Sequence, residues 1–133
     1  MGYLLDTCAV IDLVRGNQST VNQVKSKSPA EVYISSITAF ELGYGLVQNP
    51  DVKSHSKEVV RSFLSEVNIL SFSTEEADMA AQLRYSLKIA GTPIGAYDIL
   101  IAATAKVSDY VLVTSKIKEF QRIPDLTIEN WRD

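Results

Sequence analysis

The sequence predicts an α/β protein in which a small, mostly parallel β-sheet is flanked by α-helices. The main reason is that short apolar runs typical of buried strands alternate with helical segments along the whole chain. Of the 133 residues, 46% are hydrophobic and 22% are charged, which excludes a disordered chain. The chain contains no repeat, low-complexity tract or linker, so we expect a single domain over residues 1–133.

The expected strands are short apolar runs. The first, residues 3–6, reads YLLD, and the second, residues 31–35, reads EVYIS. The run YVLVT at residues 110–114 has the clearest strand character, and residues 69–72 and 126–128 complete the predicted sheet. In open α/β sheets, functional sites form beyond the carboxyl ends of the strands, and we therefore expect the site there.

Local signals at their ends define the expected helices. Capping boxes at Thr38–Glu41 and Ser73–Glu76 each open a helix. Gly16 and Gly91 stand just past the expected ends of the helices that stop at residues 15 and 90. The expected helices are residues 7–15, a short segment around residues 21–24, a segment from residue 38, and residues 57–67, 73–90 and 96–106. Residues 92–95 are expected to form a turn.

The charge and the N-terminus limit the classes of function. The net charge of −3 argues weakly against a protein built mainly to coat nucleic acid. The N-terminus lacks a basic region followed by an uninterrupted apolar run, as a secretion signal would need. The longest uncharged apolar stretch, residues 99–105, is far shorter than the roughly 20 residues of a membrane span. We therefore expect a cytoplasmic protein with no membrane partner.

Three acidic residues stand in apolar surroundings. Asp6 ends the first expected strand, while Glu41 and Asp98 lie within apolar helical segments. No lysine or arginine lies within four residues of any of them, so local salt bridges cannot neutralise these carboxylates. Carboxylates that converge at one sheet edge suit a hard divalent cation such as Mg²⁺ or Mn²⁺, which can activate water beside a phosphate.

Each acid also has a purely structural interpretation. Asp6 can cap the following helix, Glu41 can complete the capping box with Thr38, and Asp98 can be a first-turn acid that the helix dipole favours. The common placement of the three acids favours the metal site over three separate structural roles. His55 lies in a polar stretch and is expected at the surface. Because it is the only histidine, a ribonuclease that uses two imidazoles is excluded.

The sequence resembles the PIN-domain family and, within it, the VapC-type ribonuclease toxins of toxin–antitoxin pairs. Four segments in order carry the resemblance, which covers essentially the whole chain. They are LLDT at residues 4–7, SITAFELGYG at 36–45, GTPIGAYDILIAA at 91–103, and LVT at 112–114 followed by a C-terminal end that includes residues 119–120, 123–124 and 129–131.

This resemblance implies a small parallel sheet between helices and the activity of a Mg²⁺- or Mn²⁺-dependent endoribonuclease. It implies that Asp6, Glu41 and Asp98 hold the metal ion and that an RNA phosphodiester is the substrate. It further implies a VapB-type antitoxin partner and a homodimer. Four neighbouring residues are candidates to support the site or to contact the substrate phosphate, namely Thr7, Thr114, Ser115 and Lys116.

The chain departs from the family pattern at two positions. Cys8 stands where the family usually has an orienting asparagine, and Lys116 stands where it often has a further acid. A lysine cannot ligate Mg²⁺ as an ammonium, but it can occupy the space of a second cation, contact the phosphate, or point into solvent. Glu119, one helical turn further on, is a possible substitute acid. We therefore expect at most one tightly held metal ion.

Two alternative functions remain at this point. A PIN domain that binds its partner but cuts RNA poorly is compatible with Lys116 in place of an acid. A receiver-like signalling module shares the α/β plan, but it needs a phosphorylatable aspartate at the end of a middle strand, and Phe72-Ser73 offers none.

Overall fold

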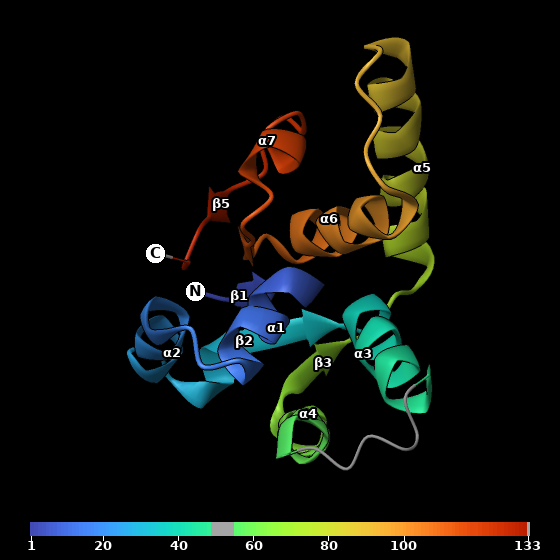
Figure 1. Cartoon of the computed structure of the whole chain (residues 1–133). Helices are drawn as coiled ribbons and strands as arrows, with labels where there is room; N and C mark the ends of the chain where they lie inside the picture. Colours follow the sequence, from blue (N-terminus) through green and yellow to red (C-terminus); the bar gives the residue numbers. More distant parts are fainter. Residues whose placement is uncertain (49–54, 133) are drawn as a thin grey trace.

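A computed structural model describes residues 1–48 and 55–132 of the chain. In these residues, five strands form one sheet in the order β3-β2-β1-β4-β5, and every neighbouring pair is parallel (Figure 1). The strands are β1 (Tyr3–Leu5), β2 (Val32–Ser35), β3 (Asn68–Leu70), β4 (Val111–Val113) and β5 (Ile128–Glu129). The predicted α/β class with a parallel sheet is therefore confirmed.

The helices lie between the strands, as the alternating pattern requires. They are α1 (Thr7–Val14), α2 (Gln18–Lys25), α3 (Ser36–Gln48), α4 (His55–Glu66), α5 (Thr74–Ile89), α6 (Ala96–Ser108) and α7 (Ile117–Phe120). A short 3₁₀ helix, η1 (Pro29–Glu31), precedes β2. The sequence did not predict α7 or η1, because elements of three or four residues are too short to show a hydrophobic period. The last strand begins two residues later than expected.

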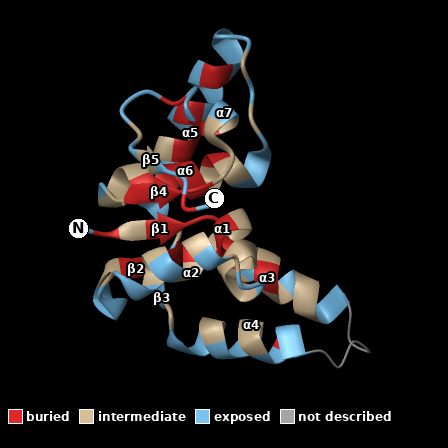
Figure 2. Ribbon diagram, turned by 60° about the vertical axis from the view of Figure 1, so that its left-hand side comes forward, coloured by how far each residue is buried: buried red, intermediate tan, exposed pale blue. Residues whose placement is uncertain are grey.

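Helices cover both faces of the sheet, and successive strand residues point to opposite sides. Leu4 and Leu112 pack with α5, α6 and α7 in one core cluster, whereas Leu5 and Val113 pack with α1 and α3 in another. All four of these side chains are buried, and the buried residues in Figure 2 run through the middle of the sheet. Burial on both faces explains why these strands read as continuous apolar runs rather than alternating ones.

One of the two predicted capping boxes is confirmed and the other is wrong. The Ser73 backbone N–H donates to Oε1 of Glu76 at 2.7 Å at the start of α5. By contrast, α3 already begins at Ser36, and the Thr38 N–H donates to the Ser35 hydroxyl at 3.1 Å. Because Ser35 supplies the cap one turn earlier, the Glu41 carboxylate is released from that structural role.

The topology creates a gap beside the central strand. The chain places β2 and β3 successively on one side of β1 and then returns to place β4 on the other side. The connections after β1 and β4 therefore leave the sheet in different directions, and such a switch point is where open α/β sheets bind ligands. No helix within residues 1–48 and 55–132 is long and apolar enough to cross a membrane.

Candidate active site

Asp6 lies at the switch point, directly after β1. Its backbone N–H donates to the Val113 carbonyl oxygen at 3.0 Å, which continues the pairing of β1 with β4. Its Oδ1 atom accepts the N–H of Ala9 at 2.8 Å, so Asp6 is the N-cap of α1 as well as a candidate ligand. The residue is only 1% exposed. The turn that starts α1 thus holds the Asp6 carboxylate in a fixed, buried position.

The surroundings of Asp6 disfavour its negative charge. The pKa of Asp6 is raised from 3.8 to about 6, chiefly by burial and to a smaller extent by the negative charge of Asp98. Hydrogen bonds from the Thr114 hydroxyl and the Ala9 N–H, together with the positive charge of Lys116, act in the opposite direction. The site therefore holds two acids whose mutual repulsion a bound cation would relieve.

Asp98 lies in the first turn of α6 and is paired with Lys116. The Nζ atom of Lys116 is 3.1 Å from Oδ2 of Asp98. Partial burial works against the charge of Lys116, but the hydrogen bond and the charge of Asp98 outweigh it and raise the pKa of that ammonium. Asp98 has no local basic partner, as expected, but it is not unpaired, because the fold brings Lys116 to it from 18 residues away in the sequence.

Thr114 links the two sides of this group. Its hydroxyl hydrogen-bonds to the Asp6 carboxylate and also accepts the backbone N–H of Lys116 at 2.9 Å. Thr114 is buried and directly follows β4, an inner strand that pairs with both β1 and β5. Ser115 and Glu119 are half-buried nearby in the chain, but in the described residues no hydrogen bond or ion pair joins their side chains to Asp6 or Asp98.

Glu41 approaches the site through Thr7. The Thr7 hydroxyl donates to Oε1 of Glu41 at 2.7 Å and lies 3.2 Å from the Thr38 hydroxyl. Thr7 follows Asp6 in the chain, so α1 and α3 meet here. Over residues 1–48 and 55–132, however, no three His, Cys, Asp or Glu side chains gather closely enough to hold one ion. The three-acid ligand set therefore remains a prediction, in which the negative charge of Asp98 acts on Asp6 and Glu41 is joined to Thr7.

The donor chemistry of this group fits a hard divalent cation. The candidate ligands are carboxylate oxygens with the Thr114 hydroxyl beside them, although the Lys116 ammonium also contacts Asp98, and Mg²⁺ is commonly held by one or two carboxylates while it keeps several waters. Gly95 lies directly beside this carboxylate, since a Cβ atom at that position would be 3.4 Å from Oδ2 of Asp98. The residues present therefore suit Mg²⁺ or Mn²⁺ better than a soft metal.

An exposed pair of aromatic side chains stands next to two of the acids in the sequence. The rings of Phe40 and Tyr97 meet edge to face with their centroids 5.7 Å apart. Their exposed fractions are 53% and 50%, which are high for large apolar side chains. Each aromatic residue directly precedes an acid, Glu41 or Asp98, and this repeated order was a usable signal in the sequence.

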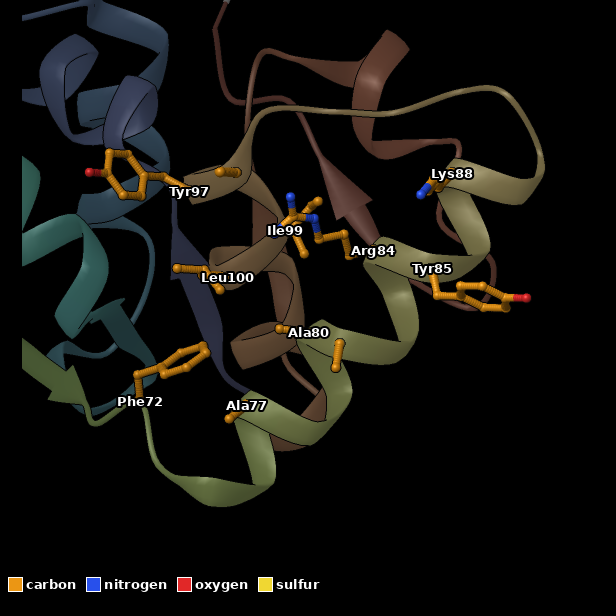
Figure 3. A pocket seen from close by; sticks show the side chains of 11 residues that line it. Phe72, Ala77, Ala80, Arg84, Tyr85, Lys88, Tyr97, Ile99 and Leu100 are labelled. Atoms are coloured by element: carbon orange, nitrogen blue, oxygen red, sulfur yellow. The ribbon is translucent and has the colours of Figure 1, made fainter.

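A concave surface lies between α5 and α6. It is a groove of about 680 Å³ with alanine side chains of α5 on one side and α6 on the other (Figure 3). Arg84, Tyr85 and Lys88 come from α5, and Tyr97 contributes from the start of α6. None of the candidate acids lines this groove, so it is a candidate contact surface rather than the chemical site.

Comparison with known proteins defines the class. A sequence model described as "PIN domain" matches residues 3–126, and the chain therefore belongs to the PIN-domain family. It is 33% identical over 129 residues to the tRNA(fMet)-specific endonuclease VapC of Salmonella typhimurium, covering 97% of both chains. It is 37% identical over 133 residues to Ribonuclease VapC2 of Rickettsia felis, covering 98% of both.

Solved structures agree with this assignment. The chain is similar to the structure of VapBC2 from Rickettsia felis bound to a DNA fragment from their promoter, with a TM-score of 0.88, 34% identity, and coverage of 98% of this chain and 99% of that one. It is also similar to DNA-bound VapBC from Salmonella typhimurium, with a TM-score of 0.85, 34% identity and coverage of 98% of both chains. The resemblance stated from the sequence is thereby confirmed.

Proposed function

We propose that this protein is a metal-dependent endoribonuclease and the toxin of a toxin–antitoxin pair. The observation that carries the proposal is the pair of carboxylates, Asp6 and Asp98, at the switch point of a PIN-domain sheet. The relatives named as ribonucleases cover almost the whole chain, which supports RNA as the substrate. A cytoplasmic location agrees with this role and stays a prediction.

The roles of the residues follow from their positions. Asp6 and Asp98 would hold a Mg²⁺ or Mn²⁺ ion, which supplies an activated water and neutralises charge on the phosphate. Thr114 orients the Asp6 carboxylate through its hydroxyl. Glu41, whose Oε1 atom accepts the Thr7 hydroxyl, would complete the metal ligands from the side of α3. Lys116 offers a positive charge to a phosphate oxygen.

The aromatic pair supports a single-stranded substrate. Phe40 and Tyr97 expose their rings beside Glu41 and Asp98. Unpaired RNA bases stack on exposed aromatic side chains, whereas bases in a duplex are not available for stacking. We therefore expect cleavage in loops or single strands rather than in paired regions.

Removal of the metal is the first test of this proposal. With EDTA, cleavage of a labelled oligoribonucleotide or of transfer RNA by the purified protein is expected to fall to background, and Mg²⁺ or Mn²⁺ should restore it. The measurement is the initial rate of fragment formation on a denaturing gel. A rate that is equal with EDTA and with metal would rule out metal-dependent chemistry. A preparation of Asp98→Asn made in parallel controls for contaminating ribonucleases.

We further propose that a VapB-type antitoxin binds this protein. The similar solved structures are toxin–antitoxin complexes, and the chain covers nearly all of the matched chains. Co-expression with the product of an adjacent reading frame is expected to yield a complex that stays together in size-exclusion chromatography and has reduced ribonuclease activity. If the two proteins elute separately and the activity is unchanged, this partner assignment is wrong.

A homodimer is also proposed, and the α5–α6 groove is its candidate surface. Tyr85 and Ile89 on α5 are 66% and 67% exposed, so this helix presents apolar side chains that have no partner within the described chain. Analytical ultracentrifugation of the wild type and of the Tyr85→Ser variant measures the mass of each. A dimer held by this face should become a monomer in the variant.

One observation favours a second candidate function, a weakened nuclease that acts mainly through partner binding. Lys116 contacts Asp98 directly, so a positive charge already occupies part of the candidate metal site. In this case the wild type would be inert on RNA, and Lys116→Asp would gain activity because it adds an acid and removes the ammonium. Clear cleavage by the wild type decides for the active enzyme.

A further inference from the structure

Lys116 combines a fixed backbone with a long, partly exposed side chain. Its backbone N–H donates to the Thr114 hydroxyl at 2.9 Å, and the residue forms the N-cap of α7. Its side chain is 40% exposed, whereas the side chain of its partner Asp98 is 18% exposed. The ammonium can therefore turn into solvent, where it regains hydration and loses only its ion pair with Asp98, while the backbone of Lys116 stays in place beside the site.

The position of this ammonium matters because of what surrounds it. Its Nζ atom lies 3.1 Å from one oxygen of Asp98, and its positive charge also acts on the carboxylate of Asp6. It thus provides, within the chain itself, the positive charge that two neighbouring carboxylates need. A lysine ammonium is a compact point charge, close in this respect to a small cation.

We propose that Lys116 is a tethered cation that competes with a divalent metal ion for Asp98. The inference rests on the proposed function, because it takes Asp6 and Asp98 as the metal site. An ion that binds Oδ2 of Asp98 must displace the ammonium, and an ion that binds only the other oxygen is repelled by it. Either way the metal affinity is lower than that of the same carboxylate pair without Lys116.

The competition also explains how the chain tolerates two close acids when no metal is bound. Without the ammonium, the repulsion between Asp6 and Asp98 would have to be relieved by protonation or by movement of α6. With it, the site keeps its arrangement and exchanges one cation for another. The protein is therefore expected to lose little stability when its metal is removed.

Substitution of Lys116 tests this proposal through metal binding rather than through activity. Lys116→Met keeps most of the length of the side chain and removes the charge. We expect the metal-stripped variant to bind Mn²⁺ about tenfold more tightly than the wild type in calorimetric titration. Lys116→Arg, which keeps a positive charge, and Lys118→Met, an exposed lysine of the same helix α7, should both bind like the wild type.

A second measurement covers the case in which a variant is less well folded. At the same Mn²⁺ concentration, the Tm of Lys116→Met should rise more than that of the wild type, because an ion that binds the folded state more tightly stabilises it more. In a background that already carries Asp98→Asn, adding Lys116→Met should give no gain in Mn²⁺ affinity over Asp98→Asn alone, since the lysine acts through that carboxylate.

The possible failures are distinguishable. If the wild type and Lys116→Met bind Mn²⁺ equally, the competition is refuted while the metal site and the proposed function stand. If neither protein binds Mn²⁺ at millimolar concentration, both the competition and the metal dependence of the proposed function are refuted. If the gain persists in the double variant with Asp98→Asn, the lysine does not act through Asp98 and the proposal is wrong.

Discussion

Asp98→Asn is expected to reduce kcat/KM for RNA cleavage by roughly 10²–10³-fold, comparable to the loss of one electrostatic group in a preorganised active site. The amide has nearly the same shape as the carboxylate, but it carries no charge and is a weaker ligand for Mg²⁺. It also removes the ion pair with Lys116 and leaves that ammonium without its present partner. The initial rate on a labelled oligoribonucleotide measures the effect.

A matched exchange controls for the chemistry of the substitution. Asp78 lies on the exposed side of α5, so Asp78→Asn makes the same change far from the site and should keep the wild-type rate. Circular dichroism should show that both variants retain the fold. If Asp98→Asn cuts as fast as the wild type, the site at the switch point is assigned wrongly.

Asp6→Asn is expected to abolish activity and, at the same time, to stabilise the metal-free protein above neutral pH. Burial raises the pKa of Asp6 from 3.8 to about 6, so the folded state holds this proton more tightly than the unfolded state. The stability from the protonated carboxyl is fully present below pH 3.8 and is lost as the pH rises to about 6. The difference of about two pKa units corresponds to ~3 kcal/mol above that range.

An asparagine avoids this loss because it carries no charge at any pH. Its Oδ1 atom can still accept the N–H of Ala9, and asparagine is a good N-cap residue, so α1 keeps its start. Urea unfolding in EDTA should therefore show that Asp6→Asn gains up to ~3 kcal/mol more, relative to the wild type, at about pH 7.5 than at about pH 3.5.

Two observations would contradict this expectation. One is a stability difference between Asp6→Asn and the wild type that does not change with pH, which would mean that the Asp6 proton is not linked to folding. The other is Mn²⁺ stabilising the variant as much as the wild type, which would mean that Asp6 does not take part in holding the ion. Asp78→Asn again reports any general effect of the exchange.

The confirmed parts of the fold had local causes in the sequence. The strands were recognisable because both faces of the sheet are covered, which makes runs such as VLV at residues 111–113 apolar throughout. The Ser73–Glu76 capping box was correct because its partners are three residues apart. The same reasoning was wrong at Thr38–Glu41, where the motif fits but the Ser35 hydroxyl already occupies the cap position.

The sequence by itself determined that this is an α/β protein with acids at the ends of its central elements, since hydrophobic periods and caps depend on neighbours within a few residues. Only the tertiary structure decided which groups face those acids. Lys116 meets Asp98 across 18 positions, and Thr7 meets Glu41 across 34. Such contacts follow from the order β3-β2-β1-β4-β5 and from how α1, α3 and α6 pack around it, because strand order and helix packing set distances that sequence spacing does not contain.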